Sequence, residues 1–183
     1  ADDRLLEGLA STSESVVLVR SLSKVEGLAA LRLGYALAAP PLARELSSGL
    51  PFAGGLYISE LALTGAVAAL TGPAVGAHRE AVLSFYRAEQ AWFAGQLEDL
   101  GLVVSVTPCP YFVARGPSKV LERARKAGAA LQLLEYPAGG GRAPEGEAHV
   151  CVLVSDRASN EETLRMVRQA LQAESDRPSW MPR

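Results

Sequence analysis

The sequence predicts an α/β protein whose C-terminal part forms a small layer of short strands and helices. Three observations support this prediction: apolar β-branched runs alternate with amphipathic stretches, the chain has 183 residues, and 49% of them are hydrophobic. Such a length fits one large domain or two small ones, and the apolar content is sufficient to bury a core. Alternating strands and helices joined by short loops favour a sheet with helices packed on one side.

Two strands and a short helix are expected near the N-terminus. Residues 15–20 form a short β-branched apolar run, which predicts a buried strand. A second strand is expected over 31–38, where apolar residues are again frequent. Pro40 and Pro41 stop that strand and are well suited to the start of a helix, so a short helix is expected over 41–46.

Two longer helices are expected next. A mostly buried helix is predicted over 56–70, and the Gly72-Pro73 pair ends it. A long amphipathic helix is predicted over 74–100. Its expected apolar face contains Val82, Leu83, Phe85, Tyr86, Trp92, Phe93 and Leu97, and its expected polar face contains Arg79, Glu80, Arg87, Glu89, Gln90 and Glu98.

The rest of the chain is expected to alternate quickly between strands and helices. A surface loop is expected over 139–146; its glycines do not precede a helix, so they do not predict a phosphate-binding loop. The polar residues 174–183 predict a loose tail. Strands are expected over 102–106, 111–114, 131–134 and 149–155, and helices over 118–127 and 160–173.

Charge and composition exclude several classes of function. A net charge of −2 provides no basic surface for a phosphate backbone, so nucleic-acid binding is not expected. Cys109 and Cys151 are too few for a disulfide scaffold or a zinc cluster. No apolar run reaches the roughly 18 residues of a membrane span, and the acidic first residues do not resemble a signal peptide. A cytoplasmic location without membrane association is therefore predicted.

The chain contains only three lysines, which restricts the candidates for an amine nucleophile. Lys119 and Lys126 share one face of a predicted helix with Arg123, a pattern typical of a solvated surface. Lys24 instead follows a predicted strand, at the position where α/β sheets bind ligands. Desolvation and a neighbouring cation favour a neutral amine, which can attack a carbonyl carbon.

Polar side chains near Lys24 add a candidate phosphate site. Ser21 and Ser23 provide hydroxyl groups, and Arg32 lies eight residues after Lys24. The planar guanidinium can bind two phosphate oxygens at once. A molecule with both an aldehyde and a phosphate would suit these four side chains.

The segment Ser21-Leu22-Ser23-Lys24, with Gly27-Leu28-Ala29-Ala30-Leu31-Arg32-Leu33-Gly34 after two further residues, resembles the lysine signature of class I/II aminotransferases. These are fold-type-I pyridoxal-phosphate enzymes, and the following Tyr35 makes the segment most similar to histidinol-phosphate aminotransferases and threonine-phosphate decarboxylases. The resemblance implies a partial large domain over 1–75, a small C-terminal α/β domain over 76–175 and a tail over 176–183.

The same resemblance implies roles for the residues of this segment. Lys24 would form the Schiff base with pyridoxal 5'-phosphate, and Ser21, Ser23 and Arg32 would hold the cofactor phosphate. The substrate would be a small amine or amino acid. Family members form homodimers, so a homodimer is expected. Because the chain resembles only the C-terminal half of the family, a complementing chain that carries the front half is the alternative partner.

Two features depart from the family pattern. Asp2 or Asp3 is the candidate partner of the pyridinium nitrogen, although Leu5 or Leu6 replaces the tyrosine expected three residues later; the alternative is a surface acid at a helix start. Residues 149–155 lack the arginine that relatives use for the substrate carboxylate. Arg157 is the candidate replacement, and the alternative for this residue is a solvated loop arginine.

The remaining candidates are weaker. His78 is expected on the surface of the long helix, and His149 and Cys151 alternate on a strand without further ligands, so no metal site is predicted. The leading hypothesis is transamination, with decarboxylation of an amino-acid phosphate as a variant. The rivals are a non-catalytic or split-enzyme half that completes a partner chain, and a plain α/β domain with a fortuitous motif.

Overall fold

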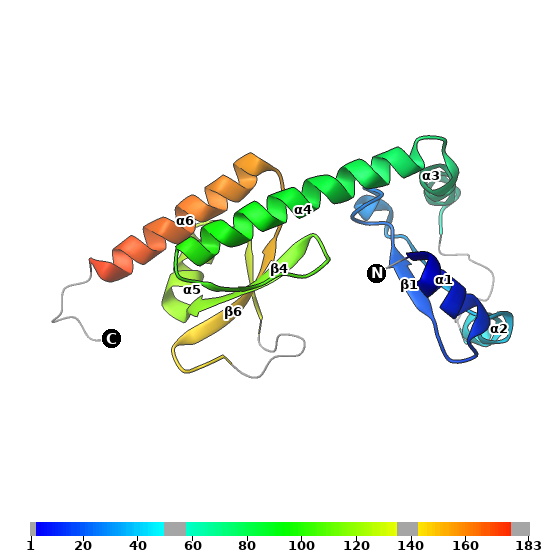
Figure 1. Ribbon diagram of the computed structural model, residues 1–183, viewed down its shortest axis with the longest axis horizontal. Helices are drawn as coiled ribbons and strands as arrows, with labels where there is room; N and C mark the ends of the chain where they lie inside the picture. The colour runs from blue at the N-terminus through cyan, green and yellow to red at the C-terminus, as the bar shows by residue number, and fades with distance from the viewer. Residues whose placement is uncertain (1–2, 50–57, 135–142, 177–183) are drawn as a thin grey trace. The chain divides into compact units, whose positions relative to one another are not determined.

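The computed structural model describes residues 3–49, 58–134 and 143–176 (Figure 1). It divides into two compact units, residues 1–82 and 83–183, which we call unit 1 and unit 2. Asp2, the glycines of the predicted loop at 139–141 and the tail from 177 lie outside the described residues. The domain limits at 75 and 175 stay a prediction.

Unit 1 contains a two-stranded sheet and several helices. The strands β1 (Leu18–Ser21) and β2 (Gly34–Leu37) pair in antiparallel fashion, with Leu18 opposite Leu37 and Ser21 opposite Gly34. The helix α1 (Asp3–Thr12), which the sequence did not predict, contacts both strands. A 3-10 turn (Ala29–Leu31), α2 (Pro40–Ser48), α3 (Glu60–Thr71) and the first residues of α4 (Val75–Asp99) complete the unit.

Two predictions about these strands are wrong. β1 was expected to be buried, yet Val19 is 73% exposed, because no described element covers the face of the sheet to which its side chain points. The second strand was expected to begin at Leu31, but β2 begins at Gly34. Arg32 adopts a left-handed conformation with φ of 55°, which interrupts extended backbone.

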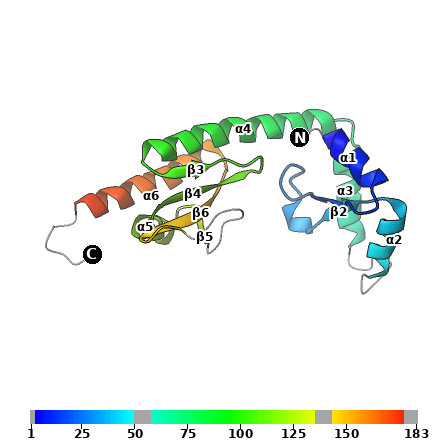
Figure 2. The same ribbon diagram turned by 60° about the horizontal axis from the view of Figure 1, so that its bottom comes forward.

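Unit 2 is an antiparallel sheet with helices, and it confirms the strands and helices predicted there. The sheet order is β3-β4-β6-β5, so the long strands β4 and β6 lie side by side at its centre (Figure 2). The elements are β3 (Val103–Ser105), β4 (Tyr111–Pro117), α5 (Ser118–Lys126), β5 (Leu131–Leu134), β6 (Glu147–Leu153) and α6 (Arg157–Ser175).

One face of this sheet forms the core of unit 2. Side chains alternate along a strand, and β4 and β6 bury every second residue, as in Phe112 and Val150. Helices α4, α5 and α6 pack on this face and add Phe93, Leu121 and Leu164 to the core. The structure confirms the prediction of helices on one side of a sheet.

The long helix α4 differs from its predicted faces at three positions. Glu89 and Gln90, expected on the polar face, are each only 7% exposed, whereas Phe85 is 46% exposed. Hydrogen bonds explain the two buried polar residues: Glu89 accepts from Arg157 and Asn160, and Gln90 donates to the Cys109 and Tyr111 carbonyls. A polar side chain with such partners can be buried at little cost.

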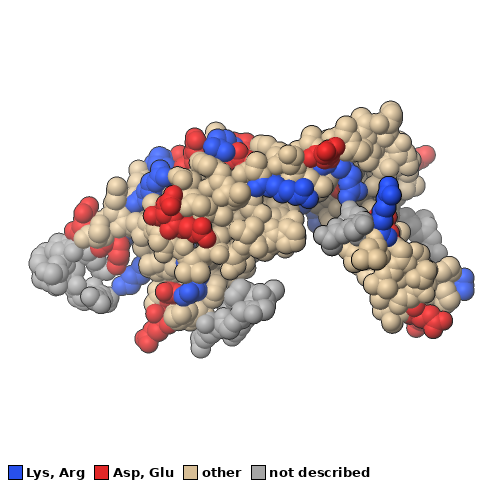
Figure 3. All heavy atoms as spheres, in the orientation of Figure 1, with Lys and Arg blue, Asp and Glu red and all other residues tan. Residues whose placement is uncertain are grey.

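Basic and acidic side chains are interspersed on the visible face (Figure 3), consistent with the small net charge. Among the described residues no single helix is long and apolar enough to cross a membrane; the pair α3 and α4, bent by 85°, passes that test by length and composition alone.

Candidate functional site

The segment from Ser21 to Gly34, here called the lysine loop, connects β1 to β2 and closes on itself. The Leu22 N–H donates to the Leu33 carbonyl at 3.1 Å, and the Leu28 N–H donates to the Leu22 carbonyl at 2.9 Å. Leu22 is only 2% exposed and anchors the loop in unit 1. These bonds give the loop a defined backbone between the two strands, and the 3-10 turn at Ala29–Leu31 is part of it.

Lys24 begins a tight turn within the lysine loop. The Gly27 N–H donates to the Lys24 carbonyl at 3.2 Å, which closes the four-residue turn. Gly27 has a φ of 70°, a conformation that favours glycine. The Lys24 side chain is exposed, so the described residues do not provide the desolvation that was expected for its amine.

The pairing of β1 with β2 brings the predicted phosphate-binding residues to neighbouring backbone segments. Ser21 pairs with Gly34, and the bond from Leu22 to Leu33 continues the same register. Ser23 follows Leu22 and Arg32 precedes Leu33, so each lies one residue beyond this backbone bond. Two hydroxyl groups and one guanidinium therefore belong to backbone that lies together at the end of the sheet, next to Lys24.

Local hydrogen bonds leave these groups able to bind an anion. Ser21 Oγ accepts a bond from the Ser23 N–H at 3.2 Å, so its own hydroxyl proton is available to donate. Arg32 Nη1 donates to the Ala29 carbonyl at 3.1 Å, which uses one of its five N–H groups. Both side chains are exposed.

Arg32 holds a conformation that is unusual for a residue with a side chain. It is the one non-glycine residue with positive φ in the described part of the chain, and it immediately follows the 3-10 turn. A left-handed conformation costs roughly 1–2 kcal/mol for an ordinary residue and is often retained at ligand sites. The conformation is therefore a reason to regard Arg32 as functional.

Gly34 is required by the close approach of the two strands. A Cβ atom at this position would lie 2.7 Å from the Arg20 carbonyl oxygen, which is backbone and has little freedom to move. We expect Gly34→Ala to separate β1 from β2 and to increase hydrogen exchange over 18–37. Gly8→Ala is the matched control, because nothing lies within 4 Å of a Cβ there and alanine favours a helix. Equal protection in both variants would contradict this account.

The lysine-loop residues fit pyridoxal phosphate by their chemistry. The amine of Lys24 can bond an aldehyde carbon, and the hydroxyl and guanidinium donors match a phosphate group. The predicted partner of the ring nitrogen cannot be placed in the same way, since Asp2 lies outside the described residues. Asp3 begins α1 and does not lie on a strand, as the helix-start alternative expects.

Arg157 is the first residue of α6, and its contacts are with α4. Its Nε lies 3.1 Å from each Glu89 carboxylate oxygen, and its Nη2 donates to Oε1 at 2.8 Å. The guanidinium also stacks on Trp92, 3.7 Å from the ring centroid. Asn160 donates a further bond to Glu89. Substrate binding by Arg157 stays a prediction, and a substrate carboxylate would compete with Glu89.

Glu89 was not recognised in the sequence as a buried residue. A signal was present, because it lies three and four positions before Trp92 and Phe93 and therefore shares their helix face. The hydrogen bond from Arg157 holds the pKa of the Glu89 carboxyl below its usual value, with burial acting in the opposite direction. The same bond raises the pKa of Arg157.

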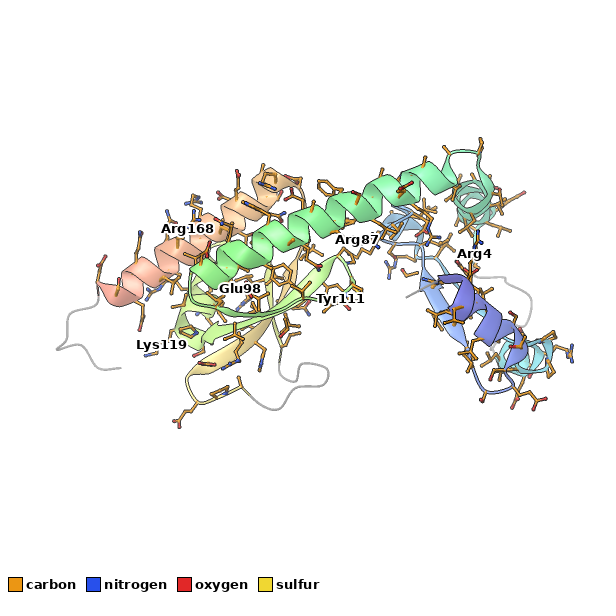
Figure 4. The ribbon with its side chains drawn as sticks, viewed as in Figure 1. Arg4, Arg87, Glu98, Tyr111, Lys119 and Arg168 are labelled. Atoms are coloured by element: carbon orange, nitrogen blue, oxygen red, sulfur yellow. The ribbon has the colours of Figure 1, made fainter. Side chains whose placement is uncertain are left out.

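The lowered pKa of Glu89 predicts how the stability of unit 2 depends on pH. A carboxyl whose folded pKa is depressed stabilises the protein above its unfolded pKa of about 4.3, and this contribution is lost as pH falls through the folded value. Glu89→Gln should therefore lower the thermal midpoint of unit 2 at pH 7, and the difference from wild type should shrink below about pH 4. Glu98→Gln, an exposed acid on the same helix labelled in Figure 4, should show no such pattern. A pH-independent difference for Glu89→Gln would contradict the assignment.

The other sequence candidates are not gathered into a second site. Within the described ranges, no three His, Cys, Asp or Glu side chains are close enough to hold a metal ion. His149 and Cys151 are both partly exposed on β6, and Cys109 is exposed. His78 is exposed on α4, and its ring bonds to the backbone of the lysine loop.

Solved structures show the same fold. A histidinol-phosphate aminotransferase from Sinorhizobium meliloti, solved in complex with pyridoxal-5'-phosphate, matches 92% of this chain with a TM-score of 0.68 and 16% identity. A histidinol-phosphate aminotransferase from Clostridium acetobutylicum matches 91% with a TM-score of 0.72 and 16% identity. An L-threonine-O-3-phosphate decarboxylase from Porphyromonas gingivalis matches 91% with a TM-score of 0.69 and 17% identity.

The match covers only part of each of these proteins: 44%, 48% and 50% of their chains, respectively. The chain thus has the architecture of a fold-type-I pyridoxal-phosphate transferase in part, as its sequence predicted. No curated protein matches it. The family model for aminotransferase class I and II matches residues 4–138, which include the whole lysine loop and most of the chain. The chain therefore belongs to the class I and II aminotransferase family.

Proposed function

We propose that this chain is the C-terminal part of a pyridoxal-phosphate-dependent aminotransferase in which Lys24 bonds the cofactor aldehyde. The observation that carries the proposal is the β1–β2 register: Ser21 pairs with Gly34 and Leu22 bonds to Leu33, so Ser23 and Arg32 each lie one residue beyond this bonded pair. Membership of the aminotransferase family supports it. The substrate class is a small amine or amino acid, and the proposed location is the cytoplasm.

Each residue of the lysine loop has a distinct task in this proposal. Ser21, Ser23 and Arg32 bind the phosphate and so fix the cofactor at one end. With pyridoxal phosphate bound, the Lys24 amine would bond the aldehyde carbon with loss of water, and when free it would accept and return a proton at the substrate carbon. When bound, pyridoxal phosphate supplies the electron sink that makes this carbon acidic.

Decarboxylation of an amino-acid phosphate is the second candidate reaction. Strand β6 (Glu147–Leu153) contains no arginine to bind a substrate carboxylate, and Arg157 is engaged with Glu89. A substrate whose carboxylate is not tightly bound is compatible with carbon dioxide loss. One structural neighbour is a decarboxylase for L-threonine-O-3-phosphate.

The reaction can be tested by its products. The chain is incubated with pyridoxal phosphate and a panel of amino acids and amino-acid phosphates, and the products are separated by chromatography. Transamination produces pyridoxamine phosphate and an oxo acid, whereas decarboxylation produces carbon dioxide and an amine. Pyridoxamine phosphate with at least one donor is the expected result. Neither product with any substrate, despite bound cofactor, would contradict an enzymatic role.

The exposed apolar surface of unit 1 supports the proposal that the chain works in a larger assembly. Only five hydrophobic residues are buried in the described part of this unit, against seventeen in the core of unit 2. We propose a homodimer or a complementing chain that carries the front half of the fold. Light scattering should then give a mass above that of one chain. The exposed large hydrophobic residues of unit 1 that would be covered in this assembly are Leu5, Leu9, Val17, Val19, Leu46, Ile58, Leu61, Leu63, Val67 and Leu70.

A further inference from the structure

Two side-chain contacts join the turn that contains Lys24 to the start of helix α4. The ring Nε2 of His78 lies 2.9 Å from the Val25 carbonyl oxygen, and Arg79 Nη1 lies 3.6 Å from Glu26 Oε1. A carbonyl oxygen can only accept, so Nε2 is the protonated ring nitrogen and donates this bond. We call Glu26, His78 and Arg79 the turn clamp.

The ionic half of the clamp is largely shielded from solvent. The Glu26 side chain is 6% exposed and that of Arg79 is 31% exposed. A carboxylate at such a site is strongly destabilising when its cation is removed. Glu26 therefore stays where Arg79 can pair with it, and this requirement restricts the backbone of the turn.

The described walls of the cavity beside the clamp offer neither Glu26 nor His78 another ionisable partner. Glu26 and His78 border a cavity of about 340 Å³, whose other described walls are small residues over 68–75 at the corner between α3 and α4. These two side chains are the only ionisable groups on those walls. Loss of either clamp contact should therefore increase the amide exchange of the turn.

The clamp acts on the residues that follow the reactive amine. Val25 and Glu26 come directly after Lys24, inside the turn closed by the Gly27 N–H. Within the described residues the Lys24 side chain makes no hydrogen bond or ion pair, and it is exposed. The backbone of the turn is thus what orients the Lys24 side chain.

We propose that Glu26, His78 and Arg79 are positioning residues that hold the Lys24 turn in the conformation that reacts with a phosphate-bearing aldehyde. The proposal rests on the proposed role of Lys24, although its first consequence concerns the protein without cofactor. None of the three residues touches the reacting atoms. They act through the backbone of Val25 and Glu26, whereas Ser21, Ser23 and Arg32 bind the phosphate.

Hydrogen exchange of the cofactor-free chain tests the clamp itself. In His78→Leu, the Gly27 and Leu28 amides should exchange about threefold to tenfold faster, the effect of losing one hydrogen bond. In Arg79→Met they should exchange at least as fast, because the shielded Glu26 carboxylate loses the cation of its ion pair. His78→Gln keeps an N–H donor and should restore part of the protection. Arg87→Met removes an exposed arginine from the same helix (Figure 4), and exchange in this control should match wild type.

Borohydride trapping of pyridoxal phosphate on Lys24 tests the positioning role. The yield of adduct should fall about threefold to tenfold in Arg79→Met and His78→Leu, in parallel with the exchange rates. Unit 2 supplies an internal check of folding, since its amide protection should be unchanged. If Arg79→Met does not fold, the two His78 variants still test the proposal.

Unchanged amide exchange at the turn in both Arg79→Met and His78→Leu would show that the clamp does not restrict the turn. Faster exchange with an unchanged adduct yield would overturn its positioning role. If wild type gives no adduct on Lys24, the proposed function fails and the positioning role fails with it, while the exchange data still decide whether the clamp exists. The two failures are therefore distinguishable.

Discussion

Lys24→Ala is expected to abolish covalent binding of pyridoxal phosphate and to lower turnover by a factor of about 10²–10⁴ or more, the usual contribution of a positioned acid–base group. Alanine can neither bond the aldehyde nor move a proton at the substrate carbon. The exposed Lys24 side chain makes no hydrogen bond or ion pair with other described residues, so the variant should keep the thermal stability of wild type. Turnover and bound cofactor are measured on the same preparations.

Lys119→Ala is the matched control for this prediction. Lys119 is also exposed, but it lies on α5 in unit 2, outside the lysine loop (Figure 4). This control should bind cofactor and turn over substrate as wild type does. Equal loss in both variants, or full activity in Lys24→Ala, would show that the reactive amine is not Lys24.

Phe93→Ala is expected to produce the largest loss of stability in unit 2, about 3–5 kcal/mol. Phe93 is fully buried, and its ring meets Phe112 edge to face with centroids 5.5 Å apart. Truncation leaves a cavity between α4 and the sheet and removes this aromatic contact. Urea unfolding of unit 2, followed by near-ultraviolet circular dichroism, measures the change in unfolding free energy.

Phe85→Ala controls for the size of this substitution. Phe85 lies on the same helix but is 46% exposed, so the same truncation should cost about 1 kcal/mol or less. A comparable loss at both positions would mean that α4 does not present Phe93 to the core of unit 2 as described.

The sequence was sufficient to predict the order of elements from β1 onward and the lysine loop. Periodicity revealed α4 because its apolar residues recur over 25 residues. The Lys24 segment was found because several residue types must occur together at fixed spacing to bind a phosphate and an aldehyde. Helix α1 was missed because it has only ten residues, too few for a clear apolar periodicity. Its apolar residues Leu5 and Leu9 are exposed in the structure.

What the sequence could not predict depends on contacts between distant residues. Burial of Glu89 requires Arg157, which lies 68 positions away, and no local pattern records that pairing. The left-handed Arg32 was hidden for a related reason, because the apolar run around it resembles a strand. The contact of His78 with the Lys24 turn also links residues 53 positions apart. The prediction that His78 lies on the helix surface was correct, but it did not reveal the bond to the Val25 carbonyl.

The position of the bond to pyridoxal phosphate decides whether Lys24 is the reactive amine, and it can be located by mass spectrometry. The wild-type chain is incubated with pyridoxal phosphate, reduced with borohydride, digested and analysed by mass spectrometry. Because the chain has only three lysines, Lys119 and Lys126 serve as internal references. We expect one adduct per chain, on Lys24, at cofactor concentrations that leave the other two lysines unmodified. Labelling of all three lysines in similar yield, or of Lys119 and Lys126 alone, would contradict it.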